Sequence, residues 1–142
     1  MFASAPSSSL FSLGTDDYVN GSTISYIAYC WRRISGYSGF GTYNGNGTSG
    51  HSITINDGGS GFAPDFVIIK RINNTDSYSH WYVFDSLRTT GVYSNQLTAD
   101  GSSLEATGTY VDFTSTGFDL DTTASNLNDS GSKFVYVAFK MN

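Results

Sequence analysis

The sequence predicts an all-β protein, folded as a single antiparallel β-sandwich or jelly-roll-like domain. Helical periodicity is nearly absent along the 142 residues. Short alternating or wholly apolar runs recur instead, at the spacing of sandwich strands. Clusters of Asn, Asp and Gly, which tolerate the positive φ of tight turns, separate these runs. The hydrophobic share of 39% and the aromatic share of 15% suffice for one compact core.

Six runs along the chain predict strands, and four clusters of turn-forming residues predict connections between them. The strands are expected over 24–31, 51–55, 66–71, 80–84, 109–113 and 134–140. The turns are expected at 57–59, 73–76, 100–101 and 128–131. Runs of this length and spacing are typical of two antiparallel sheets packed face to face.

The predicted strands differ in the composition of their two faces. The run 51–55 (HSITI) alternates polar and apolar residues, as expected of a strand with one face in water. The runs 66–69 (FVII) and 134–139 (FVYVAF) are apolar on both faces. Such a strand needs a cover on each side, and in a small sandwich the second cover is a loop, another copy or another subunit. These two runs are a first indication of assembly.

Residues 45–50 (GNGTSG) match the nucleotide-binding pattern G-x-G-x-x-G letter for letter. That pattern binds phosphate where it follows a strand and opens a helix. Here the next residues, 51–55, alternate as a strand does, and no βαβ unit surrounds them. We therefore interpret the glycines as a corner between two strands, where the backbone bends and approaches its neighbours closely.

The charge and cysteine content exclude several classes of protein. The formal net charge is −5, the isoelectric point is about 4.6, and Lys and Arg total seven, so no nucleic-acid surface is expected. No apolar run approaches the roughly 20 residues that span a membrane. Residues 1–6 lack the basic and apolar regions of a signal peptide. Cys30 is the single cysteine, which excludes an intrachain disulfide and a cysteine-based zinc site. In its strand-like run it is expected to be a buried, inert thiol.

Residues that carry chemistry are few, and we expect no enzyme, no catalytic residues, no cofactor and no metal site. His51 and His80 are the only histidines, and each lies beside a predicted strand. The sequence around Ser38 misses the G-x-S-x-G pattern of serine hydrolases by one place. Glu105 is the only glutamate, so nothing favours the paired carboxylates of a glycosidase. The Asp and Asn residues over 119–129 offer oxygen ligands, but not at the spacing of a calcium loop.

The chain repeats part of its own sequence near its two ends. Three short elements occur twice in the same order, with spacings that agree to within about three residues. Residues 1–31 therefore resemble the closing strands of a preceding repeat, and residues 32–142 are expected to form the β-sandwich repeat domain. The matching pairs are 11–14 (FSLG) with 118–121 (FDLD), 20–22 (NGS) with 128–131 (NDSG), and 26–29 (YIAY) with 136–139 (YVAF).

Further stretches carry a family resemblance that covers nearly the whole chain from Phe11. They are 36–47 (GYSGFGTYNGNG), 61–71 (GFAPDFVIIKR), 81–88 (WYVFDSLR), 115–120 (STGFDL) and 130–139 (SGSKFVYVAF). With the repeated elements, they resemble a repeat domain of virion structural and tail-fibre-like proteins from marine and freshwater phages, notably cyanophages. Such domains often occur beside concanavalin-A-like sandwich domains. The resemblance implies a structural or attachment role at the virion surface or outside the cell, and it implies no catalytic residues.

The apolar runs and the resemblance together predict a protein that assembles with copies of itself through the faces and edges of its sheets. Residues 1–31 are a candidate strand-exchange arm, which would complete a sheet in a neighbouring copy and link copies head to tail into a fibre or filament. The residues expected to make these contacts are apolar and lie in the two similar segments. They are Phe11, Leu13, Tyr26, Ile27, Tyr29, Trp31, Phe134, Tyr136 and Phe139.

Carbohydrate binding is the alternative function, with a host-surface polysaccharide as the partner. Exposed aromatic rings offer flat apolar faces to sugar rings, and Asn, Asp and backbone groups can bind the hydroxyls. The candidates are Tyr37, Tyr43, Tyr78 and Trp81, which lie in or near predicted loops. Packing in the core or in an interface is the other interpretation of each of these residues.

Overall fold

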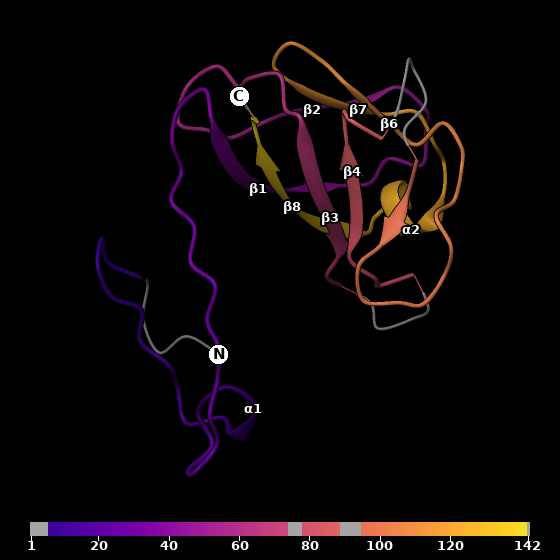
Figure 1. The fold of residues 1–142 in the computed structure, drawn as a ribbon. Coiled ribbons are helices and arrows are strands. Elements are labelled where there is room, and N and C mark those ends of the chain that lie inside the picture. Colours follow the sequence, from indigo (N-terminus) through magenta and orange to yellow (C-terminus); the bar gives the residue numbers. More distant parts are fainter. Residues whose placement is uncertain (1–5, 74–77, 89–94, 142) are drawn as a thin grey trace. The chain divides into compact units, whose positions relative to one another are not determined.

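The structure is a computed structural model that describes residues 6–73, 78–88 and 95–141. It divides into two units, Met1–Trp31 and Arg32–Asn142. The described part of the first unit contains one short helix, α1 (Asp17–Asn20). The second unit folds as two antiparallel sheets packed face to face (Figure 1). The prediction of an all-β sandwich is therefore confirmed.

Eight strands and a second short helix make up the described part of the sandwich. They are β1 (Ser38–Asn44), β2 (His51–Thr54), β3 (Phe66–Arg71), β4 (Tyr82–Asp85), β5 (Leu97–Thr98), β6 (Val111–Phe113), β7 (Gly117–Leu120), α2 (Ser125–Asn128) and β8 (Lys133–Phe139). The larger sheet has the order β1-β8-β3-β4-β5, and the smaller sheet has the order β2-β7-β6. The last strand, β8, thus lies inside the larger sheet, paired antiparallel with β1 on one side and with β3 on the other.

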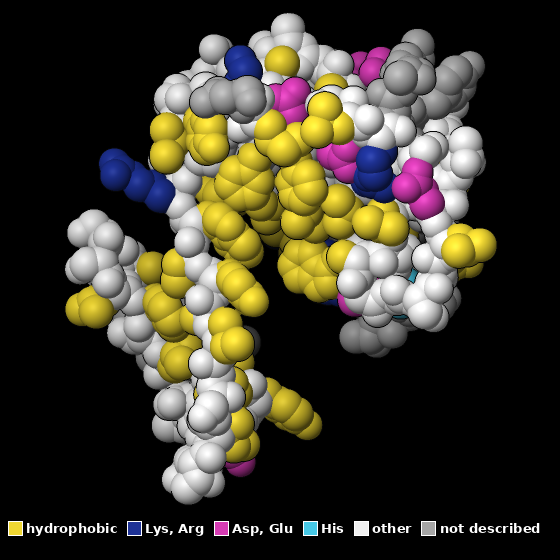
Figure 2. Space-filling model, viewed as in Figure 1, with side chains coloured by type: hydrophobic (Ala, Val, Ile, Leu, Met, Phe, Trp, Pro, Cys, Tyr) yellow, Lys and Arg dark blue, Asp and Glu magenta, His cyan; other side chains and the backbone are white. Residues whose placement is uncertain are grey.

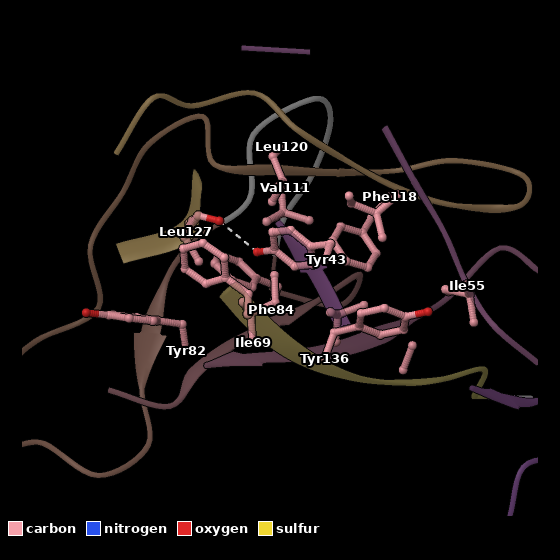
Figure 3. Close-up of a cluster of buried hydrophobic side chains, with 14 of the residues drawn as sticks. Tyr43, Ile55, Ile69, Tyr82, Phe84, Val111, Phe118, Leu120, Leu127 and Tyr136 are labelled. Carbon is pink, nitrogen blue, oxygen red and sulfur yellow. Dashed lines mark hydrogen bonds between the residues drawn. The ribbon is translucent and has the colours of Figure 1, made fainter. Parts of the chain in front are cut away.

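The core lies between the two sheets and is rich in aromatic rings (Figure 3). Tyr43 from β1 stacks on Phe134 from β8, with ring centroids 5.0 Å apart. Phe118 from β7 meets Tyr136 from β8 edge to face at 5.5 Å. The Tyr43 hydroxyl donates a hydrogen bond to the carbonyl of Leu127 at 2.7 Å (Figure 3). Burial raises the pKa of Tyr43 well above its ordinary value, so this hydroxyl stays a donor.

Five of the six predicted strands are observed within a few residues of their expected bounds, as β2, β3, β4, β6 and β8. The prediction for 24–31 is wrong, because this run pairs with no neighbouring strand among the described residues. The turn predicted at 73–76 lies outside the described residues, apart from Asn73. In contrast, β1 falls in the glycine-rich run, where the sequence predicts no strand.

Two glycines explain the unusual sequence of β1. A Cβ atom at Gly39 would stand 2.2 Å from Ile55 Cγ2, and one at Gly41 would stand 2.6 Å from the Tyr136 hydroxyl. Both distances are far inside van der Waals contact. The core side chains therefore lie directly against the β1 backbone, and this close approach requires glycine at both positions.

Residues 45–50, between β1 and β2, form the corner that the glycine pattern predicts. Gly47 and Gly50 have φ values of 69° and 82°, in the left-handed region that glycine adopts without strain. A Cβ atom at Gly45 would stand 2.2 Å from the carbonyl oxygen of Asp129. The strand β2 follows directly, so these residues do not open a helix as a nucleotide-binding loop does.

Asn128, the last residue of α2, holds this corner in place through hydrogen bonds from its buried side chain. Its side chain is fully buried, and each of its polar atoms meets two groups. Its Oδ1 accepts a hydrogen bond from the backbone N–H of Asn46 at 3.0 Å and lies 3.1 Å from His51 Nδ1. Its Nδ2 donates to the carbonyls of Thr48 and Thr122 at 2.8 and 2.9 Å. One side chain thus joins the corner to α2 and to the start of β2.

Asp57 fastens the chain just before β1 to the loop after β2. Its carboxylate accepts hydrogen bonds from the N–H groups of Gly36 and Gly59, both at 2.8 Å, and of Gly61 at 3.1 Å. These bonds, with that from Gly36 the strongest influence, lower the pKa of Asp57 from 3.8 to about 2. Because the folded pKa is depressed, the stability that this carboxylate contributes is present above pH 3.8 and is lost as the pH falls toward 2.

Candidate interaction surface

The larger sheet has one face directed away from the core, and apolar side chains make up most of this face. Side chains of a strand alternate between the two faces of its sheet. The residues next to the buried ones in β1, β3, β4 and β8 therefore point outward. We call the apolar side chains of this set the outer face. They are Phe40, Phe66, Ile68, Val83, Val135, Val137 and Phe139, and the same side of the sheet also carries Thr42, Lys70, Asp85 and Lys133.

The strand register makes the outer face continuous. Val137 in β8 pairs with Phe40 in β1 and with Ile68 in β3. Two positions further along β8, the Phe139 ring centroid lies 5.9 Å from that of Phe40 and 6.4 Å from that of Phe66. Figure 2 shows the hydrophobic side chains gathered in one patch over β8, β3 and β4. Contiguous exposed apolar surface is uncommon on a single soluble domain, so this face is the candidate interaction surface.

Charged side chains lie beside this patch (Figure 2). Three charged residues at and after the end of β4 in the sequence are paired within the chain. Arg88, just after β4, forms ion pairs with Asp85 and with Glu105, the latter at 3.0 Å from Nη1 to Oε2. Burial alone would raise the pKa of Asp85, but hydrogen bonds from Arg88 outweigh burial and the pKa is lowered. Hydrogen bonds to Asp85 and Glu105 likewise outweigh burial at Arg88 and raise its pKa, so Asp85 and Arg88 both stay charged at neutral pH.

The residues predicted to make assembly contacts do not share one surface. Phe134 and Tyr136 point into the core of their own sandwich, with 0% and 2% of their surface exposed, so the prediction for these two is wrong. The physical reason is the period of two along β8, which turns alternate side chains toward the core. Phe139 points the other way and belongs to the outer face.

The other predicted assembly residues lie in the N-terminal arm, as we call residues 6–31. Tyr29 and Trp31 stack on each other there, with ring centroids 6.2 Å apart. Cys30, between them, is exposed, so the expectation of a buried thiol is wrong. The expectation assumed a strand in a sheet, and residues 24–31 form no strand that could bury the thiol against a core. The arm exposes nearly all of its large apolar side chains. They are Leu10, Phe11, Leu13, Tyr18, Ile24, Tyr26, Ile27, Tyr29 and Trp31.

The four aromatic residues predicted to bind sugar do not form one site. Tyr43 is 7% exposed and packs in the core, so the prediction for this residue is wrong. Tyr37, Tyr78 and Trp81 are exposed, but Tyr37 precedes β1 and Trp81 precedes β4, which begin at opposite ends of the sheet, roughly 15 Å apart along the strands. Lys70 Nζ lies 5.2 Å from the Trp81 ring centroid, so a cation already lies over that ring. Sugar binding by the three exposed residues stays a prediction.

Histidines and carboxylates are dispersed over the described part of the sandwich. In the described ranges, no three His, Cys, Asp or Glu side chains are grouped to hold a metal ion. Both histidines take part in local polar contacts, His51 with Asn128 and His80 with Asp100 Oδ1 at 3.1 Å from Nδ1. Within the part of the chain that the structure describes, no helix has the length and apolar character to cross a membrane.

Comparison with known proteins identifies the family of the chain. A family model described as "Domain of unknown function (DUF7483)" matches residues 1–142, and the chain belongs to this family. The match includes both the N-terminal arm and the sandwich. No curated protein and no solved structure matches the chain. The resemblance to phage virion repeats stays a prediction.

Proposed function

We propose that this chain is a non-enzymatic structural module of a phage particle, which associates with copies of itself through the outer face. The continuous apolar outer face is the observation that carries the proposal. The phage context rests on the resemblance of the sequence to virion repeat domains. That resemblance implies a location at the surface of a virion or outside the cell.

A second copy of the chain suits the outer face in both polarity and charge. The side chains of the outer face carry no hydrogen-bonding group, so a polar partner would lose solvation there without compensation. Asp85, Arg88 and Glu105 are paired within the chain, so an identical copy would meet no unpaired charge from these three. The larger sheets of the two copies would pack about 10 Å apart, which is the usual spacing of stacked sheets. A twofold arrangement would bring the same patch of each copy together.

Val137→Lys in the full chain tests this proposal. Val137 lies at the centre of the outer face, between Phe40 and Ile68. A lysine there brings an unpaired charge into the contact between copies, whereas in a single copy its ammonium group reaches water. We expect sedimentation velocity to show associated species for the wild-type chain and only monomer for the variant at the same concentration.

Ser52→Lys is the matched control for the added charge. Ser52 is exposed on β2, in the smaller sheet, where it pairs with Asp119. The variant should therefore associate as the wild-type chain does. A wild-type chain that is monomeric at every concentration measured would refute the proposal. So would a Val137→Lys variant that associates as strongly as the control.

A further inference from the structure

The N-terminal arm contains a defined backbone pattern around α1. The N–H groups of Val19 and Asn20 donate to the carbonyl of Asp16, at 3.1 and 2.8 Å. The Asn20 side chain reaches back six residues, and its Nδ2 donates to the carbonyl of Gly14 at 2.8 Å. Three residues after the helix, Thr23 has a φ of 68°, the one positive value among the non-glycine residues that the structure describes.

The same pattern recurs around α2, with each position 108 residues further along, as Asn128 is from Asn20. The N–H groups of Leu127 and Asn128 donate to the carbonyl of Ala124, at 3.0 and 2.8 Å. Asn128 Nδ2 reaches back six residues to the carbonyl of Thr122 at 2.9 Å. Three residues after the helix, Gly131 has a φ of 78°.

This agreement goes beyond what two short helices share by default. The helix sequences, DYVN and SNLN, have only the final Asn in common at matching positions. A capped helical turn is common by itself. The hydrogen bond from the Asn side chain to the carbonyl six residues earlier and the positive φ three residues later are separate features. All three features recur at the same separation of 108 residues. The similar sequences at 11–14 and 118–121 flank the pattern in the same order. The arm and the end of the sandwich are therefore two versions of one structural element.

In the sandwich this element closes the fold; we call residues 117–139, which span β7, α2 and β8, the closing module. Its β8 supplies hydrogen bonds to both β1 and β3, and its β7 pairs with β2 and β6. Its core-facing residues are almost completely buried. They are Phe118, Leu120, Leu127, Asn128, Phe134, Tyr136 and Ala138.

In the arm, the residues that correspond to the core-facing residues of β8 are exposed. The separation of 108 residues places Ala28 and Cys30 at the positions of Tyr136 and Ala138, which face the core in β8. The similarity of 26–29 to the end of β8 is shifted by two residues from this alignment. Because strand side chains alternate with a period of two, either alignment assigns Ala28 to the core-facing side. Ala28 and Cys30 are both exposed in the arm.

Each sandwich offers one place between β1 and β3, and its own β8 fills that place. Identical copies that exchanged arms would each leave one closing segment unused, which argues against head-to-tail exchange between intact copies. We infer that the N-terminal arm is a second closing module, and that its partner is a β-sandwich of this family that lacks a closing module of its own. This inference concerns the arm alone and does not depend on association through the outer face.

The test weakens the packing of β8 in the full chain. The sandwich of the same chain then serves as a sandwich without a stable closing module, to which the arm can bind. Phe134→Ala and Tyr136→Ala remove two core rings from β8, and Val67→Cys adds a thiol on β3 at the position paired with Ala138. We expect the arm to replace β8 in the register that α1 and α2 define, with a separation of 108 residues. The native thiol of Cys30 then occupies the Ala138 position and lies beside the added thiol. Cross-strand neighbours of this kind are close enough for a disulfide.

The matched control moves the added thiol by one residue, as Ile68→Cys, to the opposite face of β3. Both chains are equilibrated in glutathione redox buffer, and the disulfides are mapped by mass spectrometry. We expect the bond from Cys30 to position 67 to exceed the bond to position 68 about tenfold. Adding Ala28→Asp, which puts a carboxylate on the core-facing side of the arm, should abolish this preference.

Two results would overturn the inference. Equal yields at positions 67 and 68 would do so, because an unfolded or loosely attached arm reaches both thiols equally well. A preference for position 67 that survives Ala28→Asp would also do so, because the arm would then reach β3 without entering the core.

Discussion

Phe134→Ala should lower the free energy of unfolding of the sandwich by about 4 kcal/mol. Phe134 is fully buried between the two sheets, and its ring stacks on that of Tyr43 at 5.0 Å. Truncation leaves a cavity that Tyr43 cannot readily fill, because the hydrogen bond from its hydroxyl to Leu127 holds it in place. Urea denaturation of the full chain, followed by circular dichroism, measures the loss.

Phe139→Ala is the matched control, since it removes the same side chain from the same strand. Phe139 lies on the outer face and is only partly buried in a single copy. We therefore expect a loss of about 1 kcal/mol at concentrations where the chain is monomeric. Similar losses at the two positions would contradict the assignment of Phe139 to an open face, because they would require an equally complete cover on that side of β8.

Asn128→Leu should cost the sandwich about 3 kcal/mol, a smaller loss than that at Phe134. Leucine has a similar volume, but it offers no partner to the N–H of Asn46 or to the carbonyls of Thr48 and Thr122. In the variant these backbone groups, at the corner and beside α2, lose their hydrogen bonds to the side chain of residue 128. The buried leucine offers no replacement for these bonds. The same urea titration measures this variant.

The arm supplies the matched control for this prediction, as Asn20→Leu. Asn20 occupies the corresponding position in the arm, but it is exposed, and its side-chain bond is to Gly14 within the arm. We expect its replacement to change the unfolding free energy by no more than about 0.5 kcal/mol. An equal loss for the two variants would mean that the arm is already closed onto a core in the isolated chain, contrary to its exposure here.

The strands that the sequence predicts are those whose own side chains define them. The alternation HSIT specifies β2, and the aliphatic and aromatic residues FVII and FVYVAF specify β3 and β8. In contrast, β1 is a strand because of what its partners require. Gly39 and Gly41 make room for Ile55 and Tyr136, which are distant in the sequence. Because these partners are not visible in the local sequence, its glycine-rich composition predicts a loop.

The outer face could be predicted only in part, because an apolar strand does not reveal which of its faces meets the core. The sequence indicates that β8 has two apolar faces, but the direction of Phe134 and Phe139 follows from the register with β1 and β3. Tyr43 illustrates the same limit. Among glycines and polar residues it resembles a loop aromatic, whereas the pairing of β1 with β8 carries it into the core.

The arm shows the opposite relation between sequence and structure. The repeated elements at 11–14 and 26–29 identify it as similar to the end of the sandwich, and the backbone around α1 and α2 agrees with that similarity. The predicted strand at 24–31 does not form, because a strand needs neighbours for its hydrogen bonds and local sequence cannot supply them. The same residues would be expected to form a strand only beside a suitable sheet.

Hydroxyl-radical footprinting of the full chain, at a dilute and at a concentrated condition, tests the role of the outer face most directly. We predict that oxidation of Phe40, Phe66 and Phe139 falls several-fold when copies associate, while oxidation of Leu104, which is 92% exposed outside this face, stays the same. Associated species that form while these three rings remain as reactive as in the dilute sample would contradict the account.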